Sequence, residues 1–319
     1  MDRNLTMQVH FGLASLSAEW SHSVVCIGTF DGVHLGHQAV ICRAVEQARH
    51  RGVPSCVVTF DRHPAATLAP DRKPPAISTL EETFSWLEAL GVELVAILPF
   101  DKEMSEMPAE RFLDEIVIQK LGAEVLVVGH DFAMGKGRQG DTHWLKERIP
   151  TEVIPPLEID GQRVSSSSIR KALREGDVSM AAGLLGRPFA LAGVVVGGKR
   201  LGRQLGFPTA NIARSVDQAL PADGIYAGRW ISRIGEYWAA VSVGLRPAVG
   251  GTDRTVEAYL LDFPGASLYG HTCRLEFLSR LRGEQNFETL DALTEQIQRD
   301  IERVRDFARE YERGPSLNV

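Results

Sequence analysis

The chain has 319 residues, of which 44% are hydrophobic and 24% charged, and its formal net charge is −6. This composition is typical of a globular protein with a sizeable core, and the length favours two domains over one. The negative charge and the lack of a Lys/Arg-rich run argue against a nucleic-acid surface. The longest apolar stretches are too short to cross a bilayer, and the N-terminus lacks a signal-peptide pattern. We therefore expect a cytoplasmic protein, monomeric or weakly homo-oligomeric, that binds neither membrane nor nucleic acid.

The cysteine pattern points to the same compartment. The four cysteines are Cys26, Cys42, Cys56 and Cys273, and no C-x-x-C pair occurs. Such scattered cysteines form neither a zinc motif nor a disulfide framework. We interpret them as buried thiols of a protein kept in a reducing cytoplasm.

The most informative segment is the glycine-rich turn GTFDGVHLGH at 28–37. The apolar run at 23–27 predicts a buried strand before it, and the periodicity of 38–52 predicts a helix after it. Backbone N–H groups and the positive end of the helix dipole then converge above the turn. The imidazoles of His34 and His37 suit that position, because they donate hydrogen bonds to phosphate oxygens that gain charge during transfer. The alternative is an ordinary turn with two solvated histidines.

The first 185 residues alternate expected strands with expected helices. This alternation predicts an α/β fold with a Rossmann-like, doubly wound parallel sheet. Ligands of such sheets bind beyond the carboxyl ends of the strands, where the turn at 28–37 and a second glycine-rich loop at 130–141 lie. The expected strands span 54–60, 92–100 and 123–129, and the expected helices span 79–91 and 108–122.

Near residue 190 the pattern changes to short strand-like runs bounded by Gly, Pro and Asp. The next long helical pattern is 290–312. This half predicts a small antiparallel β-barrel with a C-terminal helix. We place the two domains at 1–186 and 187–319. The six runs are 190–198, 206–213, 224–232, 237–244, 256–263 and 273–281.

A serine cluster followed by an arginine, RVSSSSIRKALREGD at 163–177, is the second signal. Serines at a helix start cap free N–H groups and donate to phosphates, and an arginine one turn later clamps phosphate. Alone, the segment also fits a plain N-cap with a surface arginine. Together, HLGH and SSSSIR resemble the paired signatures HxGH and ISSTxxR of the HxGH nucleotidyltransferases.

The second half narrows the resemblance. GGKRLGRQLGFPTANI at 197–212, with VEAYLLDF, SLYG and LRGEQNF, resembles the riboflavin kinase module. The order of the two modules, from about Val24 to about Asp306, is similar to that of the prokaryotic bifunctional riboflavin kinase/FAD synthetase family. The resemblance implies phosphorylation of riboflavin by ATP to FMN, and then adenylylation of FMN by ATP to FAD with release of pyrophosphate.

For the kinase half, the resemblance implies that Thr209 and Asn211 hold Mg²⁺ and ATP phosphates. Glu257 would accept the proton of the ribityl hydroxyl. Without the resemblance, Glu257 is a strand-surface residue, and Thr209 and Asn211 are turn residues. The further candidate binding residues of this half are Gly202, Gly206 and Pro208.

For the N-terminal half, the resemblance implies in-line attack of the FMN phosphate on the α-phosphate of ATP. His34 and His37 would stabilise the transition state. For Asp61 and His63, the alternative is that both are turn residues before Pro64. The candidate binding residues of this half are Gly28, Phe30, Asp31, Gly36, Asp61, Asp131, Ser166, Ser167 and Arg170.

The chain departs from the family pattern at several positions. Ser167 replaces a threonine but keeps the hydroxyl, and Arg62 replaces a proline. The other departures cluster in the kinase half, so the alternative is that only one activity is retained, with the kinase half more in doubt. Further alternatives are a nucleotidyltransferase for another substrate and a non-catalytic flavin-binding protein. The kinase-half departures are Gly197, Lys199, Ser242, Ala248, Tyr259 and Ser267.

Overall fold

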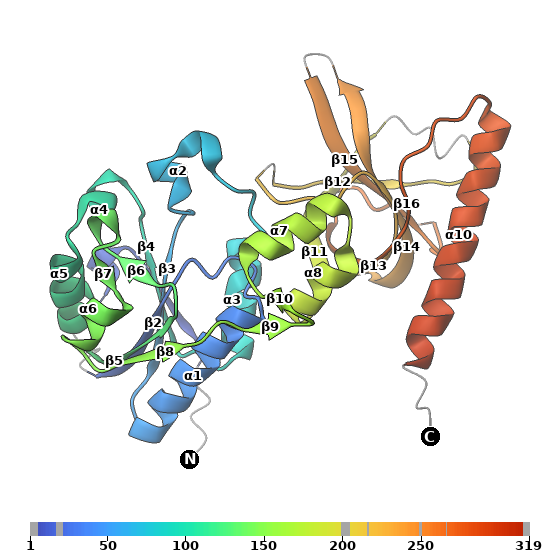
Figure 1. Cartoon of the computed structure of the whole chain (residues 1–319). Helices are drawn as coiled ribbons and strands as arrows, with labels where there is room; N and C mark the ends of the chain where they lie inside the picture. Colours follow the sequence, from blue (N-terminus) through green and yellow to red (C-terminus); the bar gives the residue numbers. More distant parts are fainter. Residues whose placement is uncertain are drawn as a thin grey trace. The chain divides into compact units, whose positions relative to one another are not determined.

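The computed structural model describes residues 6–16, 22–198, 205–215, 217–248, 251–265 and 267–314, without the side chains of 246–248 and 251–253. The chain divides into two compact units, Met1–Ser166 and Ser167–Val319. Figure 1 shows the elements of each. Among the described residues, every helix falls short of the length or hydropathy that a membrane span needs.

The first unit is built on a six-stranded sheet in the order β1-β4-β3-β2-β5-β8. Its neighbouring strands all run parallel. The connections from β2 and from β5 leave in opposite directions, so the switch point of the sheet lies outside the carboxyl ends of these two strands. The strands are β1 Gln8–Phe11, β2 Ser23–Ile27, β3 Ser55–Phe60, β4 Leu94–Leu98, β5 Ala123–Gly129 and β8 Thr151–Ile154.

Helices cover both faces of this sheet. All five residues of β2 are buried, as expected for a strand covered on both sides. Val24 and Cys26 pack in one apolar cluster with residues of α1 and α3, and Val25 and Ile27 pack in another. The predicted doubly wound sheet is therefore confirmed. The helices are α1 Leu35–Arg51, α2 Ala65–Leu68, α3 Leu80–Ala89, α4 Lys102–Glu106, α5 Ala109–Arg111 and α6 Thr142–Lys146.

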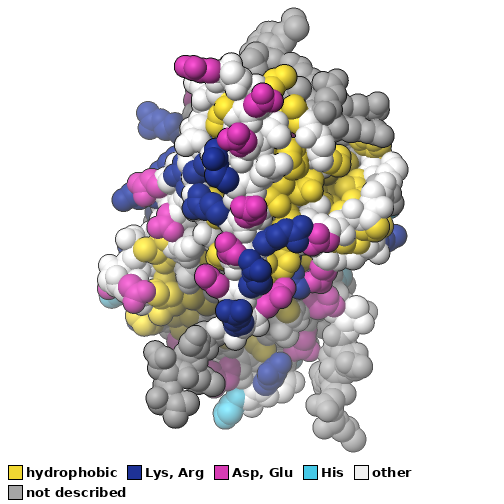
Figure 2. Space-filling model, turned by 90° about the vertical axis from the view of Figure 1, so that its right-hand side faces the viewer, with side chains coloured by type: hydrophobic (Ala, Val, Ile, Leu, Met, Phe, Trp, Pro, Cys, Tyr) yellow, Lys and Arg dark blue, Asp and Glu magenta, His cyan; other side chains and the backbone are white. Residues whose placement is uncertain are grey.

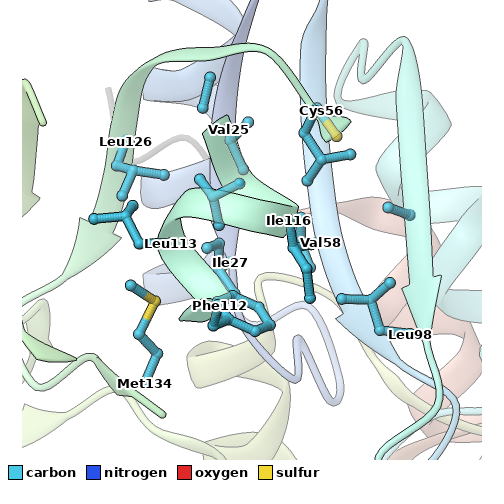
Figure 3. Close-up of a cluster of buried hydrophobic side chains, with 14 of the residues drawn as sticks. Val25, Ile27, Cys56, Val58, Leu98, Phe112, Leu113, Ile116, Leu126 and Met134 are labelled. Carbon is cyan, nitrogen blue, oxygen red and sulfur yellow. The ribbon is translucent and has the colours of Figure 1, made fainter. Parts of the chain in front are cut away.

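The helix expected at 108–122 differs from the prediction. It begins as the single turn α5 and continues as a π-helix over Phe112–Lys120. Leu121 N, for example, donates to Ile116 O, five residues back, at 3.0 Å. Figure 3 shows Phe112, Leu113 and Ile116 among residues of the sheet. The wider π turn still buries the apolar side chains that suggested a helix.

Short elements that the sequence did not predict complete this unit. The loop after β5 contains β6 Ala133–Met134 and β7 Gly140–Asp141, which pair with each other. A second two-stranded sheet joins β9 Glu158–Ile159 to β10 Gln162–Arg163. The 3-10 turns are Leu13–Ser15, Pro70–Arg72 and Lys136–Arg138.

The second unit contains a closed six-stranded barrel in the order β11-β12-β15-β14-β13-β16. All of its strand pairs are antiparallel, so the predicted barrel is confirmed. The predicted C-terminal helix is α10 Leu290–Arg313. The strands are β11 Phe189–Val196, β12 Ala210–Ala213, β13 Gly224–Ser232, β14 Gly235–Ala248, β15 Gly251–Leu260 and β16 Thr272–Arg282.

Ion pairs are among the contacts that hold α10 on the barrel. Arg282 Nη2 lies 2.7 Å from Asp300 Oδ2, and both side chains are largely buried. On the exposed side, Arg305 forms an ion pair with Asp262 at 2.8 Å.

Figure 2 shows Lys/Arg and Asp/Glu side chains interspersed rather than segregated on the face that it presents.

Helices α7 Ser166–Glu175 and α8 Val178–Leu185 pack against the barrel. Arg280 Nη1 donates to Glu175 O at 3.1 Å, and Ala222 N donates to Leu173 O at 2.8 Å. The contacts therefore group α8, and α7 from Ser167 onward, with the second unit. The module boundary at 186/187 concerns sequence modules rather than contacts, and it stays a prediction.

Candidate active sites

The turn between β2 and α1 is strained and held from outside. Phe30 and Val33 have positive φ angles of 46° and 38°. Such conformations persist only where the surroundings over-determine them. Here Asp31 Oδ1 accepts hydrogen bonds from the N–H groups of Ile77, at 2.8 Å, and Ser78, at 3.3 Å. The contacts of Asp31 thus tie the turn to the segment that precedes α3.

The two histidines of the turn lie face to face. His34 is the N-cap of α1, and its Nδ1 accepts a hydrogen bond from His37 N at 3.2 Å. The two rings stack with their centroids 3.5 Å apart and an interplanar angle of 17°. His34 is only 6% exposed, so the alternative of two solvated histidines is wrong. Two imidazoles thus meet at the positive end of a helix dipole.

Asp61 follows β3, and its contacts shape the turn there. Its Oδ1 accepts from Phe100 N at 2.9 Å, and its Oδ2 accepts from Arg62 Nη2 at 2.7 Å. Burial raises the pKa of Asp61. The hydrogen bonds and charge of Arg62 and the hydrogen bond from the Phe100 amide together lower it by more, so the pKa of Asp61 lies below its usual value. His63 Nδ1 accepts from Ala65 N at 3.1 Å. These contacts agree with the alternative of turn residues before Pro64.

Asp131 lies in the loop that follows β5, and β5 is the strand next to β2 in the sheet. Arg163 Nη2 donates to Asp131 Oδ2 at 3.1 Å and to His130 Nε2 at 2.6 Å. Arg138 Nη2 donates to Asp131 O at 2.7 Å. The sequence did not single out Arg163, although it lies two residues before the serine cluster. Two arginines from different segments therefore contact Asp131, Arg163 at its exposed carboxylate and Arg138 at its backbone carbonyl.

Ser166 is the first residue of α7 and the last residue of the first compact unit, and it contacts the histidine turn. Ser166 Oγ donates to Asp31 O at 3.2 Å. Ser167 is exposed on the first turn of the helix, in the second compact unit. Arg170, on the same helix, is only 7% exposed, so the alternative of a surface arginine is wrong.

In the barrel, the predicted kinase residues lie together. Thr209 Oγ1 donates to Glu257 Oε2 at 2.8 Å. Asn211 pairs directly with Glu257 across β12 and β15, and Ser242 pairs with it across β14 and β15. Directly paired residues project to the same face of a sheet. Val256 and Ala258, on either side of Glu257 along β15, are buried. Because side chains alternate between the two faces along a strand, Glu257 projects to the opposite face from theirs.

This group has the chemistry of a magnesium site. Its hydroxyl, amide and carboxylate oxygens are the ligands that Mg²⁺ prefers. A Cβ placed on Gly198 would lie 2.3 Å from Asn211 Nδ2, so only glycine leaves room for the amide there. Among the described residues, no three His, Cys, Asp or Glu side chains form a ready-made cation cage. Such a site would leave most of the coordination to nucleotide phosphates and water.

The glycine-rich loop before Thr209 is described in part. Gly202 and Lys199 lie outside the described residues. Gly206, with a φ of 87°, and Pro208 are exposed just before Thr209.

The remaining departures from the family pattern in this half leave the oxygens of Thr209, Asn211 and Glu257 in place. The ring of Tyr259, two residues after Glu257, lies edge-on to the ring of Phe207, with the ring centroids 5.9 Å apart. Gly197 and Ser267 are exposed. Ala248 lies at the end of β14 and pairs with Gly251.

The cysteines are all free thiols. Burial raises the pKa of Cys56 and of Cys273 to about 12, which keeps both protonated and unreactive. The prediction that all four are buried is wrong for Cys42, which is exposed. Cys42 lies on the outer side of α1, a face that a helical period alone does not assign to core or solvent.

Comparison with known proteins finds two family matches in this chain, one in each half. A family model described as FAD synthetase matches residues 16–168, and one described as riboflavin kinase matches residues 185–308. A solved structure from Streptococcus pneumoniae, described as a macrolide-efflux protein, has a TM-score of 0.86 at 31% identity, covering 94% of this chain and 98% of that one.

Several curated relatives are named bifunctional riboflavin kinase/FMN adenylyltransferase. The protein of Pseudomonas fluorescens is 38% identical, covering 95% of this chain and 98% of its own. That of Escherichia coli K12 is 35% identical, covering 94% and 98%. That of Bacillus subtilis is 33% identical, covering 89% and 92%. With such identity over nearly the whole length of both chains, this protein belongs to the bifunctional riboflavin kinase/FMN adenylyltransferase family.

Proposed function

We infer that this chain phosphorylates riboflavin to FMN with ATP and then transfers an adenylyl group from ATP to FMN, giving FAD and pyrophosphate. The observation that carries this inference is the presence of both family matches, in one chain and in order. The retention of only one activity is not favoured, because relatives with both names align over nearly the full length. Efflux is a property named for the Streptococcus protein, and both family matches favour enzymatic activity here.

We propose that Glu257 is the general base of the kinase step. The ribityl hydroxyl would lose its proton to this carboxylate as its oxygen attacks the γ-phosphorus of ATP; the bond from that phosphorus to the β–γ bridging oxygen breaks, and ADP leaves. Phosphoryl transfer depends mainly on positioning and charge neutralisation, so one carboxylate beside a phosphate site suffices. The hydrogen bond from Thr209 holds one carboxylate oxygen and supports this role.

We propose that ATP binds as its Mg²⁺ complex, with Thr209 and Asn211 as the protein ligands. When bound, the ion neutralises phosphate charge. The close approach of Gly198 to Asn211 supports the proposal, because it fixes the amide beside the backbone.

We propose that His34 and His37 donate hydrogen bonds to the α-phosphate of ATP during adenylyl transfer. The FMN phosphate attacks in line, and pyrophosphate leaves. Ser166, Ser167 and Arg170 would bind the triphosphate, with Gly28, Asp31 and Gly36 forming the turn beneath it. Asp61 and Asp131 would line the pocket at the same edge of the sheet. The stacked imidazoles at a helix N-terminus support this assignment.

We also propose that the protein acts in the cytoplasm on small molecules alone. Its four free thiols, three of them buried, suit a reducing compartment.

The direct test is to incubate the purified protein with riboflavin, ATP and MgCl₂ and to separate FMN and FAD by chromatography. We expect FMN to appear first and FAD to follow. FMN alone would mean that the N-terminal half is inactive. FAD formed only from added FMN would mean that the kinase half is inactive, and no product from either flavin would contradict the proposed function.

A further inference from the structure

Phe30 is the residue of the histidine turn that is both strained and almost fully buried. Its side chain is 2% exposed, and its φ is 46°. The left-handed region is rare for a bulky residue, and such strain clusters where a site needs a fixed geometry. The ring therefore acts through its protein neighbours rather than by meeting solvent.

The first neighbour is the backbone at the start of the turn. A Cβ atom placed on Gly28 would lie 3.1 Å from Cζ and 3.2 Å from Cε1 of Phe30. The ring thus lies so close to Gly28 that a side chain there would press on it. Gly28 gives the ring a rigid backbone wall.

The second neighbour is a histidine. The rings of Phe30 and His37 have centroids 5.3 Å apart and an interplanar angle of 81°, the edge-on geometry that aromatic pairs prefer. His37 also stacks on His34, whose Nδ1 is bound to the His37 amide. A Cβ on Gly36 would lie 3.2 Å from two atoms of the His34 ring. The imidazole of His37 is therefore bounded by two rings, each set against a glycine.

We propose that Phe30 is a positioning residue for adenylyl transfer, because its ring sets the plane of the His37 imidazole. This proposal rests on the proposed function of His37 as a donor to the α-phosphate. A donor stabilises developing charge only at the right distance and angle, so a rotated imidazole lowers the rate of the step. Ground-state binding of ATP and FMN depends on other groups and changes less.

The test is Phe30→Leu, which keeps apolar volume but removes the ring. We expect kcat for FAD formation from added FMN to fall about 10-fold to 100-fold, the range for a misplaced catalytic group. The KM values for ATP and FMN should stay within about twofold, as expected for loss of an interaction made only in the transition state. FMN formation by the same molecules should be unchanged. An unchanged kcat for FAD formation would overturn the proposal.

The matched control is Phe112→Leu. Phe112 is 4% exposed and lies in the core of the same unit, in the apolar cluster of Figure 3. It loses the same ring, and its variant should melt at a lower temperature while keeping kcat for FAD formation. An equal loss of kcat in both variants would assign the effect of Phe30 to general packing. If Phe30→Leu does not fold, Phe30→Met provides the same test with a more adaptable side chain.

A double variant separates this proposal from the function on which it rests. If Phe30 acts through His37, adding Phe30→Leu to His37→Ala should change kcat less than about twofold, because the contact is already gone. A further tenfold loss would overturn the positioning role. If His37→Ala alone keeps the wild-type kcat, the proposed function of His37 fails. If His37→Ala lowers kcat and Phe30→Leu does not, only the role of Phe30 fails.

Discussion

In the parallel-sheet unit, the candidate reacting groups come from turns that follow the strands, whereas in the barrel they project from strands paired to each other. His34 and His37 are held by a turn with positive φ angles, which Asp31 ties to the backbone N–H groups of residues 77 and 78. Asn211 and Glu257 are held by strand register, and Thr209, just before β12, donates a hydrogen bond to Glu257. The geometry of a site built from turns depends on contacts with distant segments. The geometry of a site built on a ladder of hydrogen-bonded strands is set by the pairing of those strands.

The largest expected effect comes from separating the two regions. A fragment of residues 187–319 keeps every barrel strand, so we expect it to form FMN but no FAD, even from added FMN. A fragment of residues 167–319 also keeps α7 and α8, which pack on the barrel, and should melt at a higher temperature. Chromatography and thermal unfolding followed by circular dichroism measure both. A folded 187–319 fragment without kinase activity would show that the halves are not separable.

The next effect concerns the ladder-built site. Glu257→Gln keeps the shape of the side chain but cannot take a proton, so kcat for FMN formation should fall by about 10²–10⁴. Added FMN should still become FAD at the wild-type rate. The control is Glu236→Gln, an exposed carboxylate on β14 that pairs with Arg229. Near-normal turnover in Glu257→Gln would leave catalysis to positioning and the metal.

The turn-built site has the complementary prediction. Loss of one preorganised donor costs about 10²–10³ in turnover, so His37→Ala should reduce FAD formation by that factor. FMN formation should be nearly unchanged. His50→Ala, an exposed position near the end of the same helix, is the control. Equal losses of both activities would mean that His37 supports folding instead.

The dependence of the turn on distant contacts is tested by two glycines. Gly32 has a φ of 80°, and a Cβ there would lie 2.8 Å from Ile77 Cγ2. Gly52 has a φ of 72° with nothing within 4 Å. Gly52→Ala should cost about 1–2 kcal/mol of unfolding free energy from backbone strain alone. Gly32→Ala should cost a further 1–3 kcal/mol, roughly, from overpacking, and should also lower FAD formation. Equal melting temperatures for the two variants would contradict the expected clash between a side chain at position 32 and Ile77.

The smallest effect concerns the exposed ion pair after β3. Burial raises the pKa of Asp61, but Arg62 and the Phe100 amide depress it overall. The pair therefore stabilises the fold above the unfolded pKa of about 3.9, and the contribution is lost as the pH falls through the lower folded pKa. Arg62→Gln should lower the melting temperature near neutral pH by less than Gly52→Ala does. The difference in melting temperature between Arg62→Gln and the wild type should vanish at a pH below the folded pKa of Asp61. A difference that persists there would exclude this ion pair as its cause.

Sequence patterns were most successful where local physics decides the outcome. The buried run at 23–27 and the glycine-rich turn after it were placed correctly, because strand composition and helix capping are local properties. The π-helix at 112–120 was missed, since an apolar pattern that repeats about every four residues does not distinguish a π turn from an α turn. Arg163 was missed because its partner, Asp131, lies 32 residues away.

By itself, the sequence determined two units of different architecture and the turn that carries the histidines. Both follow from periodicity, turn residues and short spacings, which depend on neighbours along the chain. The serine, threonine and glutamate residues were singled out only through the resemblance of their motifs to those of a known family. Only the tertiary structure decided that Asp31 ties the turn to residues 77 and 78 and that Thr209 bonds Glu257 across 48 residues. Such contacts join segments that are distant in sequence, and only strand order, register and packing bring them together.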